Sequence, residues 1–181
     1  MLEINTKEDE FYDHRTNTFI QIPACTLTLE HSLISLAKWE SKWHMPYFDP
    51  NITRTSAQDL DYIRCMVVGN IKSEYVFKAL SLENIIKIRD YIKDPMTATT
   101  FQQKSKSKTK KEVTTAETLY AHMFAHSIPI ECQKWHLNRL LTLLRVCDLQ
   151  NAPREKMTKK QTAQWNAEQN AARKAKYNTR G

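Results

Sequence analysis

The segment ECQKWHLNRLLTLLRVCDL, residues 131–149, has the apolar pattern that decides the fold class. At 100° per residue, its leucines share one half of a helix surface with two cysteines and His136. Trp135 and Val146 fall on the opposite half, with Arg139 beside them. We therefore expect one helix, with its leucines on the domain core and Trp135 facing a second layer. The apolar half contains Cys132, Leu137, Leu140, Leu141, Leu143, Leu144 and Cys147.

The chain just before this segment also has a helical pattern. Thr114-x-x-Glu117 has the spacing of a capping box, in which the side chains and backbone N–H groups at a helix start satisfy one another. The helix that it predicts ends before Pro129, because a proline disfavours a helical conformation in the residue that precedes it. Two helices separated by so short a turn should pack as a hairpin or a sharp corner.

A last helix is predicted after the segment. Thr158-x-x-Gln161 resembles another helix start, and the helix should span roughly 159–177. An alanine-rich helix of about 19 residues is marginal alone in water. We expect it to fray, to lie on the domain or to become ordered on a partner. Its few apolar side chains are an i, i+4 ladder of alanines and one tryptophan, namely Ala163, Ala167, Ala171, Ala175 and Trp165.

The first half of the chain predicts strands and then helices. Short β-patterns occur at 2–4, 19–22 and 26–31, with Pro23 at an edge or a bend, so we expect a small antiparallel meander. The pattern then becomes helical, and the capping box Thr55-x-x-Gln58 marks the clearest helix start.

Two further details of the helical region can be predicted. Trp39 and Trp43 lie four residues apart on the first helix and should pack in the core. Gly69 can supply a left-handed stop for the helix that begins at the Thr55-x-x-Gln58 capping box.

The predicted fold class is α+β, mainly α, in three parts. A β meander occupies residues 1–31, and a helical core occupies residues 32–153. This core contains a basic loop at 102–112, and a basic helical tail follows at 154–181. The elements are too few and too short for two large domains.

The net charge of +7 is concentrated in two segments. Residues 104–111 contain five lysines, and residues 154–181 carry eight basic and two acidic side chains. The rest of the chain has 14 basic and 18 acidic side chains, so the body is acidic. Basic segments can contact polyanions or acidic partners, but such runs are more often solvated, and we favour the solvated interpretation. The lysines of the loop are Lys104, Lys106, Lys108, Lys110 and Lys111.

The sequence lacks the motifs of common enzyme sites. Two glycines are too few for a Gly-rich phosphate loop, and neither G-x-S-x-G nor C-x-x-C occurs. Four residues could be drawn as a zinc site, but no carboxylates support them and Pro129 separates the two pairs. We therefore expect no enzyme activity, no cofactor and no metal. The four residues are His122, His126, Cys132 and His136.

Two tryptophans lack an evident apolar environment. Trp165 belongs to a helix with too little apolar surface to bury it, and Trp135 lies off the main stripe of its segment. Burying an exposed indole is favourable by about 2–3 kcal/mol. Each ring therefore needs a partner, or the two rings cover each other within one chain. The candidate partner-binding residues are Trp135, Arg139, Val146, Trp165, Ala167 and Ala171.

Four blocks of sequence are distinctive as strings, although none is a catalytic motif. They are SLISLAKWESKWHMPYF (32–48), RDYIKDPMTATTF (89–101), ECQKWHLNRLLTLLRVC (131–147) and KYNTRG (176–181). Together they resemble a family of long-tailed bacteriophage proteins, the tail assembly chaperones. The resemblance covers most of the chain, and the basic loop is its least characteristic part.

The resemblance implies a non-enzymatic role in virion morphogenesis, in the cytoplasm of the infected host. Such chaperones coat the tape-measure protein and recruit tail-tube subunits, and the basic tail and acidic body also suit self-association. The alternatives are a structural protein of the virion, in the tail or at the head–tail junction, and, less favoured, a nucleic-acid-binding protein. No apolar stretch reaches the length of about 18 residues that a membrane helix needs, so we expect no membrane partner.

Overall fold

The computed structural model describes residues 1–71, 73–101, 113–152 and 159–177. The fold is α+β and mainly α, as predicted. The chain forms two compact units, Met1–Cys147 and Asp148–Gly181. The β strands therefore belong to the same unit as most of the helices.

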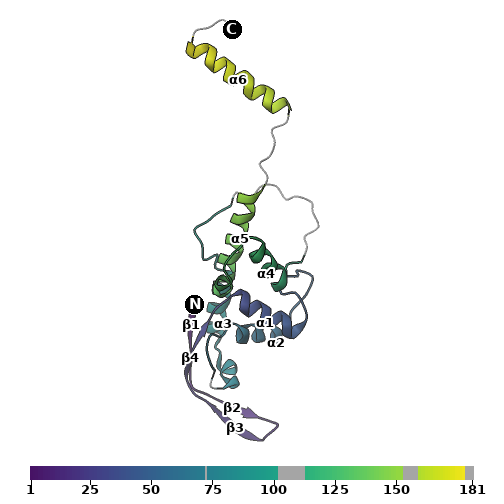
Figure 1. The fold of residues 1–181 in the computed structure, drawn as a ribbon. Helices are drawn as coiled ribbons and strands as arrows, with labels where there is room; N and C mark the ends of the chain where they lie inside the picture. Colours follow the sequence, from purple (N-terminus) through teal and green to yellow (C-terminus); the bar gives the residue numbers. More distant parts are fainter. Residues whose placement is uncertain (72, 102–112, 153–158, 178–181) are drawn as a thin grey trace. The chain divides into compact units, whose positions relative to one another are not determined.

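The N-terminal strands form one bent, two-stranded ribbon (Figure 1). β1 (Leu2–Thr6) pairs with β4 (Cys25–Leu29), and β2 (Asp9–Asp13) pairs with β3 (Thr18–Ile22), both antiparallel. The predicted meander of 2–4, 19–22 and 26–31 is wrong, because it would pair β3 with β4, whereas β3 pairs with β2, a strand that was not predicted. The chain instead reverses once, in the turn between β2 and β3, and Pro23 lies where the two ladders are interrupted.

The first four α-helices begin at side-chain caps. The capping box of Thr55 and Gln58 is confirmed, with Gln58 N–H donating to the Thr55 hydroxyl and Thr55 N–H to the Gln58 side chain. The second box starts one residue later than predicted, because Thr115 rather than its neighbour is the cap. The helices are α1 (Leu33–Trp43), α2 (Ser56–Cys65), α3 (Leu82–Lys93), α4 (Ala116–Ala125), α5 (Leu137–Asn151) and α6 (Lys159–Tyr177), and the 3₁₀ helices are η1 (Glu74–Ala79) and η2 (Ile130–Lys134).

The structure differs from one predicted helix boundary and agrees with another. α2 ends at Cys65, so Gly69 does not stop it; the left-handed Gly69 (φ 98°) lies in the loop beyond. The last helix has the predicted bounds of 159–177, whereas its predicted cap Thr158 lies outside the described residues.

Residues 131–149 do not form the single helix that their pattern predicts. Residues after Pro129 form the 3₁₀ helix η2, Trp135 is extended (φ −70°, ψ 160°), and α5 begins only at Leu137. A 3₁₀ helix has a tighter winding than the 100° per residue on which the predicted faces depend. The angular position assigned to Trp135 is therefore wrong.

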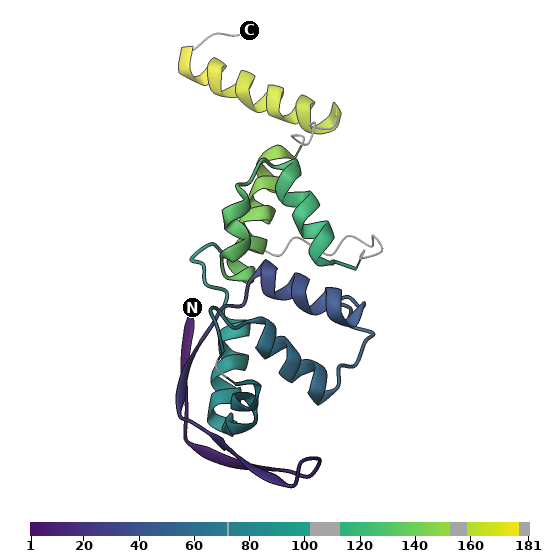
Figure 2. The same cartoon turned by 60° about the horizontal axis from the view of Figure 1, so that its bottom comes forward.

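α1 lies between two apolar clusters, with α2 on one side and α4 on the other (Figure 2). Trp39 is fully buried in the first cluster, as predicted, and Leu33 and Leu36 are fully buried in the second. The first core cluster joins the ribbon, α2, η1 and α3, and the second joins α1, α4, η2 and α5. Trp39 Nε1–H also donates to Gln58 O at 2.9 Å, so the buried indole has a polar partner in α2.

A junction of four residues connects the end of the ribbon to the start of α5. Leu137 N–H donates to His31 O at 2.6 Å, and Ser32 pairs with His136 in an isolated antiparallel bridge. All four residues are buried. We call His31, Ser32, His136 and Leu137 the histidine junction.

The two histidines of the junction pack against each other and use their nitrogens differently. Their ring centroids are 5.1 Å apart. His31 Nδ1 and the Tyr62 hydroxyl share a hydrogen bond of 2.6 Å, and His136 Nε2–H donates to Tyr91 O at 3.0 Å. Tyr91 in turn donates to Glu30 Oε1 at 2.7 Å. His136 Nδ1 is buried without a hydrogen-bond partner in the described part of the chain.

Burial keeps both rings neutral. Burial, together with a smaller effect of the neighbouring His136, lowers the pKa of His31 to about 3. Burial also lowers the pKa of His136, although its bond to Tyr91 O and the charges of Glu30 and Asp94 act in the opposite direction. A proton on either ring would add an unpaired charge to the interior.

The histidine junction should make the Met1–Cys147 unit sensitive to acid. The unfolded chain binds a proton on His31 near pH 6.5, whereas the folded chain keeps His31 neutral down to about pH 3. The stabilising effect of the neutral ring is therefore complete above pH 6.5 and is lost as the pH falls towards 3, by about 1.4 kcal/mol per pH unit. Urea unfolding from about pH 7 to about pH 4.5 measures this slope.

Two variants complete this test. His31→Gln removes the titrating group, so the free energy of unfolding should depend less on pH. His14→Gln removes an exposed histidine near the ribbon turn and should leave the slope of the wild type unchanged. Equal slopes for the wild type and His31→Gln would contradict the assignment.

Candidate interaction surfaces

Trp135 and Arg139 lie together at the start of α5. The Arg139 guanidinium carbon is 4.2 Å from the centre of the Trp135 ring, a cation–π contact. Trp135 is partly buried and packs against the second core cluster, whereas Arg139 is exposed. The expectation that the core does not reach Trp135 is therefore wrong, because the extended backbone at this residue turns the ring towards the cluster.

Val146 completes the part of the predicted surface that lies on α5. The Val146 side chain is partly buried, so Arg139 is the exposed member of the three. Together they present a guanidinium held against an aromatic face, which suits a partner with both an apolar and an acidic side chain. Their role in partner binding stays a prediction.

A second cation–π pair involves α5 and was not predicted. The Arg145 guanidinium carbon is 4.1 Å from the centre of the Phe101 ring. Arg145 is exposed and Phe101 is partly buried. The two residues are 44 positions apart, and such a long-range pair has no local sequence signal.

The other predicted contact residues lie on α6. Trp165 is 52% exposed, and no residue of this helix is buried. Ala167 and Ala171 are also exposed. The helix carries five basic side chains and one acidic side chain, Lys159, Lys160, Arg173, Lys174, Lys176 and Glu168.

The residues of the hypothetical zinc site are not assembled as drawn. His122 and His126 pair on α4 with ring centroids 4.9 Å apart. Cys132 is buried in the second core cluster, and His136 belongs to the histidine junction. Within the described ranges, Cys132 and His136 do not belong to the group of possible metal ligands that contains His122 and His126.

The predicted polyanion contacts, Lys104, Lys106, Lys108, Lys110 and Lys111, lie outside the described residues.

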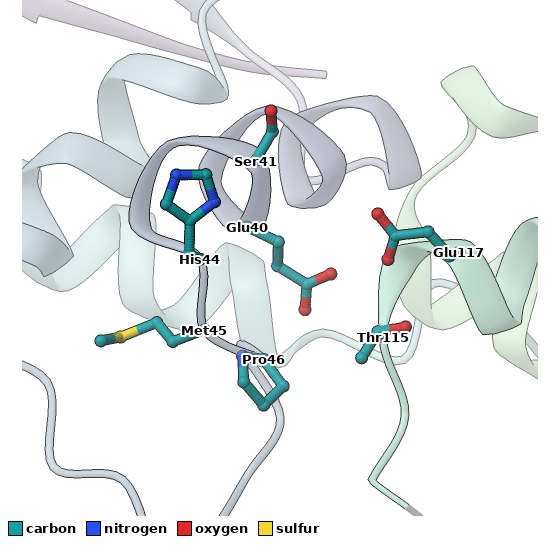
Figure 3. Close-up of a pocket in the computed structure, with 7 residues that line it drawn as sticks. All are labelled: Glu40, Ser41, His44, Met45, Pro46, Thr115 and Glu117. Atoms are coloured by element: carbon teal, nitrogen blue, oxygen red, sulfur yellow. The ribbon is translucent and has the colours of Figure 1, made fainter.

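A pocket of about 420 Å³ lies between the C-terminal end of α1 and the start of α4 (Figure 3). The Glu40 carboxylate points into it and is 7% exposed. Its Oε1 accepts a hydrogen bond from Tyr47 N–H at 2.8 Å, and its Oε2 accepts one from Ala116 N–H at 2.7 Å. The pocket is lined by Glu40, Ser41, His44, Met45, Pro46, Thr115 and Glu117.

Glu40 is a structural carboxylate. Burial raises its pKa, and the charge of Glu117 acts in the same direction, while the two backbone N–H groups oppose them. Because both oxygens hold backbone groups, Glu40 fixes the first residue of α4 against α1. Sequence reasoning missed Glu40, since backbone N–H partners leave no pattern in the sequence.

Comparisons of the chain with protein-family models, with curated proteins and with solved structures find no match. Among the described residues, no helix combines the length and the apolar character required to cross a membrane.

Replacing Glu40 tests its structural role. Glu40→Gln substitutes an NH₂ group for one acceptor, so a buried backbone N–H loses its partner, and we expect a loss of about 2 kcal/mol in the free energy of unfolding. Glu117→Gln, on the rim of the same pocket, is the control and should change stability by no more than about 0.5 kcal/mol. Urea unfolding at neutral pH measures both, and similar effects for the two variants would refute the assignment.

Proposed function

We propose that the protein is a non-enzymatic tail assembly chaperone of a long-tailed bacteriophage. It binds the tape-measure protein or the tail-tube protein during virion morphogenesis and is released as the tail is completed. The resemblance of four sequence blocks to this family supports the proposal, as does the character of the exposed side chains.

The observation that carries the proposal is the exposed state of α6. A helix of 19 residues that buries none of them obtains no packing energy of its own. Its Trp165 offers a large apolar surface, and its alanines allow another helix to approach closely. These are the properties of a segment that acquires its packing by binding another helix.

The charge of α6 suits a temporary complex. Five basic side chains and one acidic side chain favour association with an acidic partner and shorten the search for it. Exposed charges of this kind contribute more to association rate than to affinity. A chaperone that must leave its client benefits from fast association and modest affinity.

The Trp135–Arg139 pair supports the proposal from the other unit. The indole is already partly packed, so a partner would add to its burial rather than supply all of it. The exposed guanidinium can hydrogen-bond to an acidic side chain of the partner while it stays on the ring. In the proposed function this pair provides specificity, and α6 provides most of the apolar contact.

Co-expression of the protein with the tape-measure and tail-tube proteins of its phage tests the proposal. Trp165→Ala should weaken capture at least about tenfold, because an indole contact is worth about 2–3 kcal/mol. Tyr177→Ala is the matched control: it removes another exposed aromatic side chain of α6 and should have a smaller effect.

Three results would oppose the proposal. They are a lack of capture by either tail protein, capture that is equally strong with Trp165→Ala, and a high copy number in purified virions. The last result, from mass spectrometry, would favour the structural-protein alternative.

A further inference from the structure

The two halves of the ribbon differ in how their outer edges are covered. In the half formed by β1 and β4, other parts of the chain supply hydrogen bonds. Asn84 Nδ2–H donates to Asn5 O of β1 at 3.2 Å, and Val68 N–H donates to Thr28 O of β4 at 2.9 Å. This half is therefore closed to further strands.

The β3 edge in the other half has no strand paired with it among the described residues. Among the described residues, no hydrogen bond from outside the ribbon reaches the backbone of β3. Thr18, Phe19 and Gln21 are exposed, Phe19 by 67%. An edge strand of this kind presents unpaired N–H and C=O groups to any strand that can align with it.

This half of the ribbon is held firmly, so its open edge is a defined surface. On the inner face, the Phe11 ring stacks on Tyr75 of η1 with centroids 6.1 Å apart, and Lys78 Nζ lies 3.1 Å from the centre of the Phe11 ring. On the outer face, Tyr12 and Phe19 form a cross-strand aromatic pair at 4.9 Å. Such pairs fix the register of a ribbon.

The charges of the two strands differ. β2 contains Asp9, Glu10 and Asp13, whereas β3 (TFIQI) has no charged residue. Natural edge strands are usually protected by charges, prolines or bulges, and within its five residues β3 has neither a charge nor a proline. Two β2 edges would repel each other, but two β3 edges would not.

We infer that β3 is the contact edge of a homodimer, in which β3 of one copy pairs antiparallel with β3 of a second copy. The product is a four-stranded sheet with the order β2, β3, β3 and β2. The contact is self-complementary, as two-fold symmetry requires, because each copy contributes the same uncharged strand. The two-fold axis is perpendicular to the sheet, so both Phe19 side chains lie on one face.

The dimer should be weak and reversible. Pairing of two five-residue strands buries less surface than a stable interface needs. β3 and α6 belong to different compact units, and the inferred dimer does not rest on the proposed function.

Sedimentation equilibrium of the full chain, from about 10 µM to about 1 mM, tests this inference. We expect a reversible monomer–dimer equilibrium that Phe19→Lys weakens at least about tenfold, because two ammonium groups would then lie on the same face of the shared sheet. Thr26→Lys is the matched control, since it adds the same charge to an exposed position of β4, in the covered half, and should leave dimerisation unchanged. Hydrogen exchange at high concentration should slow at β3 amides and not at β2 amides.

Several results would overturn the inference. A monomer over the whole range removes it, as does a dimer that Phe19→Lys and Thr26→Lys affect equally. Slower exchange on α6 instead of β3 would assign self-association to the tail.

Discussion

The hydrogen bond that Leu137 N–H donates to His31 O, at 2.6 Å, ties the end of the ribbon to the start of α5. It lies beside two buried histidines whose rings stay neutral, one bonded to Tyr62 and the other to Tyr91. Each of these tyrosines belongs to the first core cluster, whereas Leu137 belongs to the second. The junction therefore joins the two apolar clusters, as α1 also does through Trp39 on one side and Leu33 and Leu36 on the other. Buried polar groups so placed are costly unless they are paired.

The position of the exposed surfaces follows from this junction. Because α5 can begin only at Leu137, Trp135 is left extended and turns its ring towards the second core cluster, with Arg139 over its outer face. Glu40 fixes α4 to α1 in a similar way, through backbone groups rather than through apolar contact. The Trp135–Arg139 pair thus lies where the start of α5 is hydrogen-bonded to the end of the ribbon.

Local features of the fold could be predicted from the sequence, and long-range features could not. The strands β1, β3 and β4, the Thr55–Gln58 capping box and the bounds of α6 depend on neighbouring residues, and these predictions are confirmed, whereas β2 was not predicted. The pairing of β1 with β4 depends on contacts between distant residues, and periodicity does not encode which strands pair. The second cap was predicted one residue too early, because Thr114 and Thr115 are equally suited to capping. In the structure Thr115 is the cap, and the next residue, Ala116, donates its N–H to Glu40.

The candidate site divides in the same way. The exposed Trp165 and its alanine neighbours could be predicted because an amphipathic count over one helix is sufficient. Trp135 could not, since a 3₁₀ turn after Pro129 changes the angular position of every residue counted from residue 131. The contact between Arg139 and Trp135 is local, but recognising it requires the backbone conformation at Trp135.

The histidine junction, together with α1, makes the two core clusters one cooperative unit. Native-state hydrogen exchange at the Leu137 amide, compared with amides of α2 and α4, is the test of this cooperativity. We expect the Leu137 amide and the amides of α2 and α4 to exchange with the free energy of global unfolding. Their exchange rates should also depend equally on the concentration of denaturant. Exchange at Leu137 and α4 through a separate opening of lower free energy, while α2 stays protected, would contradict it.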